Sequence, residues 1–133
     1  MERDRSSFDS FFREEQAALL RYSWGLTTDR DAARDAAKEA MTRAWKDWAQ
    51  LDGTRPAAWI RTVALNLVRS NWRAARPAPV AASRPEQVDQ PVDADVVAAL
   101  RALPERQREA VVLHRLGDLS VEDCAAAMGL AVP

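Results

Sequence analysis

Apolar side chains recur at steps of three and four residues along most of the chain, the spacing of one face of an α-helix. The pattern is clear near the N-terminus, at Phe8, Phe11, Phe12, Leu19 and Leu20. No run of alternating β-branched residues appears. The sequence therefore predicts an all-α fold. The expected helices cover about residues 6–26, 30–48, 57–75, 94–103, 104–117 and 120–128.

Residues 76–91 interrupt this pattern with four prolines among small and polar side chains. Such a composition is typical of an extended, poorly packed linker, and so sharp a shift marks a domain boundary. We therefore expect two helical domains, residues 6–76 and 93–133, joined by a flexible linker over residues 77–92. The sequence leaves open whether the two domains pack together or move freely.

Composition narrows the class of protein. With 133 residues and 47% hydrophobic content, the chain can bury one modest core or two small ones. No stretch approaches the roughly 20 apolar residues that span a bilayer, and the N-terminal residues do not form a signal peptide. We therefore expect a cytoplasmic protein without membrane insertion. The single cysteine, Cys124, excludes an intramolecular disulfide and a Cys-based zinc site, and no metal or cofactor is expected.

The sequence gives little support to an enzyme. The single histidine, His114, has no cysteine or carboxylate arranged with it as a nucleophilic or metal site, and is expected at a helix surface or partly buried. Cys124 lies on an alanine-rich helix face and is expected to be a small buried hydrophobe. Phosphorelay or metal binding by the histidine, and redox sensing by the thiol, are the weaker alternatives.

The third predicted helix has two different faces. No acidic residue stands between Asp52 and Glu86. At 100° per residue, the arginines of this helix share about a third of its circumference, opposite an apolar stripe. These arginines are Arg61, Arg69, Arg73 and Arg76. Exposed helix faces usually mix both signs of charge, so this face favours binding of a polyanion over an ordinary solvated surface.

Aromatic residues accompany these arginines. Trp59 and Trp72 lie on either side of Asn66 in the sequence. Arginines that hold phosphates, beside flat side chains that stack on bases, are typical of single-stranded nucleic-acid binding. Trp59 lies next to the apolar stripe and is expected in the core rather than on the binding face, whereas Trp72 fits either place.

The second predicted helix has a polar face of another kind. Asp35, Glu39 and Arg43 follow four-residue steps, with Thr42 and Lys46 beside them. On charge and spacing alone, pairing within the helix explains these residues better than binding to a partner does.

Three segments, in this order, resemble motifs of the extracytoplasmic-function sigma factors, the smallest bacterial relatives of sigma-70. Residues 31–45 read DAARDAAKEAMTRAW and resemble the core-polymerase-binding helix, D-x-x-Q-E-x-F-x-x-A-W, with Lys38 and Met41 in place of Gln and Phe. Residues 59–76 read WIRTVALNLVRSNWRAAR and resemble W-L-x-x-I-A-x-N-x-x-x-x-x-x-R. Residues 100–117 read LRALPERQREAVVLHRLG and resemble L-x-x-L-P-x-x-x-R-x-x-x-x-L, which opens region 4.

The resemblance implies roles for individual residues. Region 2, residues 6–76, would dock on the clamp helices of core RNA polymerase through Asp35, Glu39, Arg43 and Trp45. It would also capture the melted, single-stranded −10 promoter element, with Asn66 reading a flipped base and arginines holding phosphates. The residues implied in DNA binding are Arg55, Trp59, Arg61, Asn66, Arg69, Trp72, Arg73 and Arg76. An anti-sigma factor is a further implied partner.

The C-terminal residues resemble only part of region 4. Ser120 is expected to cap the last helix with Asp123 completing a capping box, and Gly129 to make the turn of a helix-turn-helix. The sequence ends at Pro133, before the recognition helix that would enter a DNA groove, so we expect no reading of the −35 element. The apolar side expected to be exposed consists of Val121, Ala125, Met128 and Leu130.

A sigma factor that directs promoter-specific transcription initiation is therefore the function that the sequence favours. The alternative is a truncated regulatory protein that binds polymerase or an anti-sigma factor without recognising a promoter.

Overall fold

The structure, a computed structural model, describes residues 4–51, 55–74 and 93–130, with the backbone alone over 71–74. The described residues form the predicted all-α fold. Its helices are α1 (Arg5–Thr27), α2 (Arg30–Lys46), α3 (Pro56–Ala74), α4 (Ala94–Ala102), α5 (Glu105–Val111) and α6 (Val121–Met128). A 3-10 turn, η1 (Trp48–Leu51), follows α2, and a π-helical turn, η2 (Val112–Leu116), continues α5.

Local hydrogen bonds set the ends of these helices. Asp4 caps α1 by accepting a hydrogen bond from the backbone N–H of Ser7, and the Ser7 hydroxyl accepts one from the N–H of Asp4. Ser120 caps α6, as predicted, by accepting from the N–H of Asp123 at 3.0 Å. Gly129 ends α6 in the left-handed conformation, with φ of 73°. A side-chain cap at a helix N-terminus, such as Asp4 or Ser120, typically stabilises the helix by about 1 kcal/mol.

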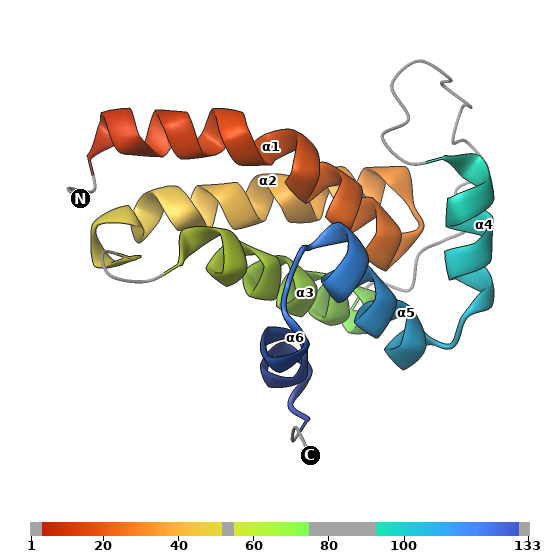
Figure 1. Cartoon of the computed structure of the whole chain (residues 1–133). Helices are drawn as coiled ribbons and strands as arrows, with labels where there is room; N and C mark the ends of the chain where they lie inside the picture. Colours follow the sequence, from red (N-terminus) through yellow and green to blue (C-terminus); the bar gives the residue numbers. More distant parts are fainter. Residues whose placement is uncertain (1–3, 52–54, 75–92, 131–133) are drawn as a thin grey trace.

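The first three helices pack side by side, and the C-terminal half of the chain is added to them. Figure 1 shows α1, α2 and α3 as an up-and-down bundle, with α4 at one end of it. The α5–η2 rod lies against α1, and α6 extends below α3 on the opposite side from α1. α4 joins a smaller apolar cluster formed by Trp24, Ala33 and Val97.

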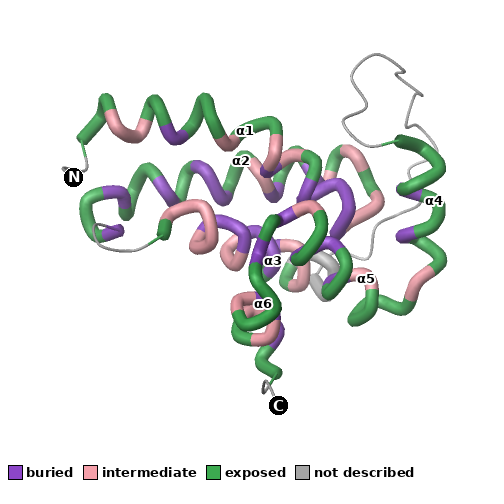
Figure 2. Tube along the Cα trace, viewed as in Figure 1, coloured by how far each residue is buried: buried purple, intermediate pink, exposed green. Residues whose placement is uncertain are grey.

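One core joins the two halves that the sequence separates. Leu19 and Tyr22 of α1, Ile60 and Leu65 of α3, and Val112 and Leu113 of η2 are all completely buried in a single cluster. Figure 2 shows these buried segments meeting where α5–η2 crosses the bundle. The question of packing that the sequence leaves open therefore has an answer: the segment from residue 93 packs on the N-terminal bundle and adds to its core.

Two glycines allow this close approach. A Cβ at Gly25 would lie 2.8 Å from Leu116 Cδ1, and a Cβ at Gly117 would lie 2.9 Å from Tyr22 Cε1. Contacts under 3.0 Å essentially never occur for real Cβ atoms, so a larger residue at Gly25 would displace the end of the Leu116 side chain, and one at Gly117 would meet both the Tyr22 ring and the Leu113 carbonyl oxygen. The missing side chains are thus what lets the two helical elements meet.

The exposed apolar side predicted for α6 is partly wrong. Val121 and Leu130 are exposed, as expected, and Ala125 is half-buried. Met128 is buried instead, because α6 turns that side chain into the shared core together with Cys124. The predicted linker, residues 77–92, lies outside the described residues. None of the helices in the described ranges combines the length and the apolar character needed to cross a membrane.

Candidate functional site

The polar face of α2 is open to solvent. Asp35, Glu39 and Arg43 are all exposed, while Ala36, Ala40 and Ala44 fill the buried side of the same helix. Arg43 Nε lies 3.1 Å from Glu39 Oε2, which is the i,i+4 pair expected from spacing alone. Both side chains remain about half exposed, so the pair adds little to stability and leaves the face accessible to a partner.

Aromatic side chains extend this face. Trp45 is 49% exposed although its ring lies 5.1 Å from that of Phe8, between centroids. Phe12 is also exposed, and its ring is 6.3 Å from Phe8. The buried Trp48 holds these aromatic side chains in place: its ring packs on Phe8, and its indole N–H donates a hydrogen bond to the Ser7 hydroxyl. We call Asp35, Glu39, Arg43 and Trp45 the α2 face; a large exposed aromatic residue beside charges is a common feature of interface hot spots.

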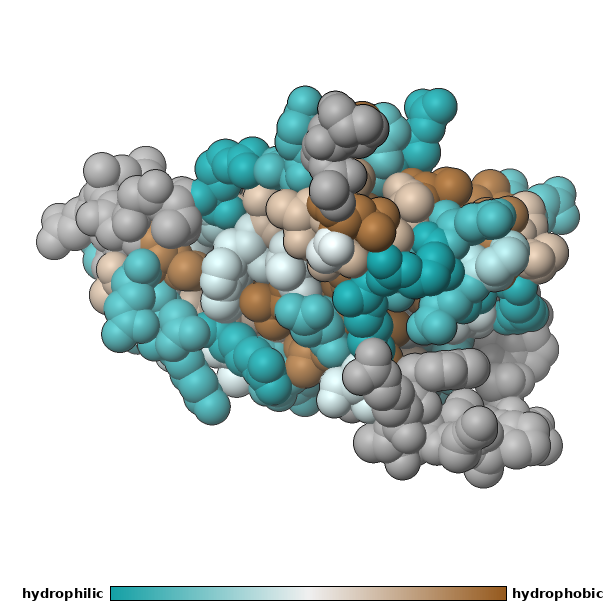
Figure 3. All heavy atoms as spheres, turned by 90° about the horizontal axis from the view of Figure 1, so that it is seen from below, coloured by the Kyte–Doolittle hydropathy of each residue, from teal (hydrophilic) through white to brown (hydrophobic). Residues whose placement is uncertain are grey.

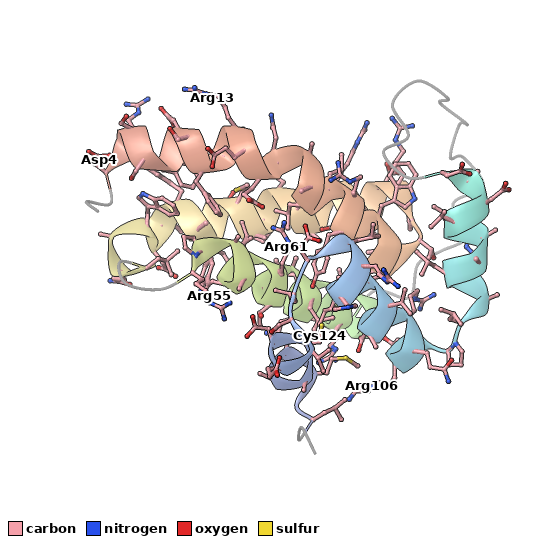
Figure 4. All side chains as sticks on the ribbon, viewed as in Figure 1. Asp4, Arg13, Arg55, Arg61, Arg106 and Cys124 are labelled. Atoms are coloured by element: carbon pink, nitrogen blue, oxygen red, sulfur yellow. The ribbon has the colours of Figure 1, made fainter. Side chains whose placement is uncertain are left out.

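Arg61 and Arg69, the two arginines of the predicted face whose side chains the structure describes, do not form an exposed binding face. Arg61 is 4% exposed, and its Nη2 lies 2.8 Å from Glu15 Oε1 on α1. Its guanidinium also lies over the Tyr22 ring, 5.8 Å from the centroid, and its carbonyl oxygen accepts a hydrogen bond from the Tyr22 hydroxyl. The prediction that Arg61 faces a partner is wrong, because α1 covers the edge of α3 where the helical arc of arginines begins. Figure 4 shows Arg61 at the middle of the helical bundle.

Arg69 is also held within the fold. Its Nε and Nη2 donate to the two carboxylate oxygens of Glu109 on α5, at 3.0 and 2.7 Å. Glu109 is buried, and Arg106 approaches the same carboxylate at 3.5 Å. The hydrogen bonds that Arg69 donates to Glu109 raise the pKa of Arg69, so the guanidinium stays charged despite its partial burial. Arg69, a second arginine of the predicted phosphate-binding face, thus has a carboxylate partner already.

Arg55, just before α3, is exposed but paired as well. Its side chain is 73% exposed, and its Nη1 and Nη2 lie 2.9 and 3.0 Å from the carboxylate oxygens of Asp123 on α6. These hydrogen bonds lower the pKa of Asp123. The capping box expected at Ser120 is therefore only half formed: Ser120 accepts from the Asp123 backbone, while the Asp123 carboxylate binds Arg55.

A hollow separates the beginning of α3 from α6. Its volume is about 430 Å³, and its lining includes Arg55, Trp59, Thr62, Asp123 and Ala127. Trp59 is half-buried: one part of it packs on the core, as expected, and another lines this hollow. Figure 3, viewed from the side on which α6 extends, shows hydrophilic and hydrophobic residues interspersed rather than one continuous polar strip.

The remaining predicted DNA contacts divide into two groups. Asn66 is exposed on α3, as a residue that reads a base would need to be. The side chains of Trp72, Arg73 and Arg76 lie outside the described residues.

Sequence reasoning missed the three carboxylates that pair with these arginines. Glu15, Glu109 and Asp123 come from α1, α5 and α6, at distances of 46, 40 and 68 positions from their partners. For Glu109 a signal was present: it stands three and four positions before Val112 and Leu113, on the apolar side of the same rod. A carboxylate on such a side is almost always paired with a cation.

His114 and Cys124, the residues considered for metal binding, phosphorelay or redox sensing, make local contacts within the fold. His114 is exposed, with its Nδ1 2.9 Å from the Leu119 carbonyl oxygen. Cys124 is buried, as expected, and burial raises the pKa of its thiol, with a further contribution from Asp123. Across the described ranges, no group of three or more His, Cys, Asp or Glu side chains could hold a metal ion.

Two family models match the chain. The model described as "Sigma-70 region 2" matches residues 11–77. The model described as "Sigma-70, region 4" matches residues 93–133.

Curated proteins similar to the chain carry related names. The RNA polymerase sigma-E factor of Streptomyces coelicolor is 30% identical, over 93% of this chain and 75% of that protein. The ECF RNA polymerase sigma factor EcfG of Rhodopseudomonas palustris is 33% identical, over 86% of this chain and 69% of the relative. The ECF RNA polymerase sigma factor SigL of Mycobacterium tuberculosis is 39% identical over a shorter stretch, which covers 50% of this chain and 39% of that protein. No solved structure matches the chain.

Proposed function

Because the chain belongs to the sigma-70 family of RNA polymerase sigma factors, we propose that it initiates transcription in two steps, each with its own surface. In the first step the α2 face docks on the clamp helices of core RNA polymerase. In the second step the start and outer side of α3 capture the melted −10 element as a single strand. Both steps take place in the cytoplasm, where polymerase and promoter meet.

The α2 face supports the docking step. It presents two carboxylates, one arginine and the half-exposed ring of Trp45 on a helix whose other side is fixed in the core. Its acidic groups lie nearer the start of the helix and Arg43 nearer the end, so a partner with complementary charges has one favoured orientation. This exposed face is the observation that carries the proposal.

The capture step has support from residues of three kinds. Arg55 and Asn66 are exposed, and Trp59 presents part of its ring to the hollow beside Arg55. A cation for phosphates, an amide for base edges and an aromatic ring for stacking are what single-strand binding requires. Trp72, Arg73 and Arg76 would extend this surface by their place in the sequence. Unstacking a base costs a few kcal/mol, which contacts to the extruded base offset.

An anti-sigma factor is a further proposed partner. The support for it is membership of the family, together with the exposed Phe12 and Trp45 rings, which a protein partner could cover. Such a partner would compete with polymerase for the α2 face.

A regulatory protein that binds polymerase without capturing a promoter is the second candidate. One observation favours it: Arg55, Arg61 and Arg69 each have a carboxylate partner within the chain. In that arrangement docking could occur while the phosphate-binding groups stay occupied.

The experiment that separates these candidates is a titration of the chain into fluorescently labelled core polymerase, followed by a single-stranded −10 oligonucleotide. We expect docking and then capture of the oligonucleotide by the assembled holoenzyme. A scrambled oligonucleotide of the same length controls for the general attraction of DNA to basic proteins. Docking without preferential capture would favour the regulatory candidate, and no docking would overturn the assignment of the α2 face.

A further inference from the structure

A polar contact deep in the core joins α1 to α3. Arg61 is 4% exposed, and its Nη2 lies 2.8 Å from Glu15 Oε1. The guanidinium lies 5.8 Å from the centroid of the Tyr22 ring, and the Tyr22 hydroxyl donates a hydrogen bond of 2.8 Å to the Arg61 carbonyl oxygen. Burial raises the pKa of Tyr22, so this hydroxyl stays protonated and remains a donor. We call Glu15, Tyr22 and Arg61 the Arg61 cluster; in it, two residues of α1 hold both the side chain and the backbone of one residue of α3.

The Arg61 cluster is a costly way to join two helices. Nε and Nη1 of Arg61 are buried and have no hydrogen-bond partner among the described residues. A buried donor without a partner destabilises a fold, and an apolar pair of similar volume is often as stable as a buried ion pair, or more stable. Stability alone therefore does not account for an arginine at this position. A requirement for one fixed arrangement of α1 and α3 does account for it, because buried polar contacts specify a unique core.

Apolar packing by itself specifies the rotation of α3 only loosely. Small side chains contribute to the core on both sides of this helix pair, with Ala64 of α3 in the same cluster as Ala40 and Ala44 of α2. Hydrophobic contacts have no preferred direction, and a core defined only by volume and pattern loses its unique arrangement before it loses stability. The Arg61 cluster adds direction, because its ion pair and its hydrogen bond form together at one rotation and one axial position of α3.

Arg61 lies almost opposite the residues of α3 that are proposed to meet a base. Trp59 and Asn66 are seven positions apart, so at about 100° per residue they lie within roughly 20° of each other on one face of the helix. By the same count, Arg61 is about 160° from Trp59 and about 140° from Asn66. Thr62, between them in the sequence, lines the hollow together with Trp59. The Arg61 cluster therefore holds the back of α3, and any rotation at the back moves Trp59 and Asn66 together at the front.

We propose that Glu15, Tyr22 and Arg61 are positioning residues for base capture: they set the rotation and axial position of α3 against α1 and thereby place Trp59 and Asn66 at the extruded base. The proposal rests on the proposed capture function of α3. A side-chain tip about 6 Å from the helix axis moves about 2 Å when the helix turns by about 20°. A hydrogen bond to a base edge is lost by such a shift, because donor–acceptor distances vary over only about 0.5 Å. Small errors in the placement of α3 are thus enough to remove base reading.

The first experiment asks whether the Arg61 cluster sets the placement of α3. Gln16→Cys on α1 and Ser70→Cys on α3 introduce two exposed sites for spin labels, in a Cys124→Ala background that removes the native thiol. Pulsed electron paramagnetic resonance then gives the distribution of distances between the two labels. We expect one narrow distribution with the cluster intact, and a shifted or broadened one when Glu15→Gln and Arg61→Met are added. An unchanged distribution would overturn the proposal, whether or not the chain captures DNA.

The second experiment measures base discrimination, which is the ratio of the holoenzyme's affinities for the −10 oligonucleotide and for a scrambled one of the same length. We expect Glu15→Gln with Arg61→Met to lower this ratio roughly tenfold, the weight of about one base-edge contact. The salt dependence of binding should stay the same, because the buried Arg61 makes no phosphate contact. Arg61→Lys keeps a cation beside Glu15 and the Tyr22 ring, and should recover most of the ratio.

Val97→Ala separates positioning from a general loss of stability. Val97 is buried in the smaller cluster with Trp24 and Ala33, apart from the core cluster that contains Tyr22, so its truncation lowers stability at another place. The ratio should stay unchanged in this variant, and an equal fall there would overturn the positioning role. Equal ratios in the wild type and in Glu15→Gln with Arg61→Met would also overturn it, while the capture function stands. A wild-type chain without preference for the −10 oligonucleotide would instead overturn the capture function, on which the positioning role depends.

Discussion

The α2 face and the arginines of α3 are both charged helix surfaces, yet the fold treats them in opposite ways. On α2, Asp35 and Glu39 stay exposed, and Glu39 pairs with Arg43 along the helix itself. On α3, Arg61 and Arg69 are drawn into contacts with α1 and α5. A run of like charges is therefore weaker evidence of an open binding surface than a mixed one, because carboxylates from elsewhere in the chain can neutralise it.

The largest expected effect concerns the exposed member of this comparison. Replacing Asp35 and Glu39 together by Arg should weaken polymerase binding more than about a hundredfold, since like charges set against each other cost several kcal/mol. The measurement is the docking titration with labelled core polymerase. The double variant Asp9→Arg, Glu14→Arg makes the same charge change at exposed positions of α1 and should bind normally. Unchanged affinity in the first variant would remove α2 from the docking surface.

The next effect concerns the most buried arginine. Glu15→Gln should lower the free energy of unfolding by about 3 kcal/mol, because it leaves the Arg61 charge buried without its counter-ion. Glu15 is 22% exposed, so the expected loss of stability lies at the lower end of the usual range for a buried ion pair. Urea denaturation followed by circular dichroism measures the change. The double variant Glu15→Gln, Arg61→Met should recover most of the loss, and no recovery would show that the damage lies elsewhere.

A smaller effect separates Arg55 and Arg69 from the buried Arg61 in DNA binding. The logarithm of the affinity of the holoenzyme for the −10 oligonucleotide should fall with the logarithm of the salt concentration by about 0.7 per phosphate contact. Arg55→Ala with Arg69→Ala should flatten that slope by about 1.4, whereas Arg61→Met should leave it unchanged. A slope that responds to Arg61 and not to the other two would reverse the division of roles.

The smallest expected effect is again on α2. Arg43→Ala should change the free energy of unfolding by less than about 0.5 kcal/mol, because the pair with Glu39 is half exposed on both sides. The same variant should weaken polymerase binding, so that stability and docking respond separately. A loss of stability above 1 kcal/mol would mean that the α2 face holds the fold together rather than serving a partner.

The local features of the protein could be predicted from the sequence with good accuracy. Helical periodicity depends on neighbours within one or two turns, and the helix ends at Thr27, Met128 and elsewhere fall within two residues of the expected ones. The polar side of α2 followed in the same way from the four-residue steps of Asp35, Glu39 and Arg43, whereas the exposure of Trp45 did not. The resemblance to sigma factors also rests on motifs that are continuous in the sequence, and the family matches confirm it.

Only the tertiary structure decided that Arg55, Arg61 and Arg69 are paired within the fold. The partners of Arg55, Arg61 and Arg69 lie 40 or more positions away, on helices whose placement depends on the packing of the whole core. That packing depends in turn on close approaches such as Gly117 against Tyr22, which no local pattern reveals. The sequence by itself determined the helices, the family and the polar side of α2. The single core, and the pairing of α3 with α1, α5 and α6, were decided by contacts between distant segments, because charge neutralisation in a fold is a property of three-dimensional neighbours.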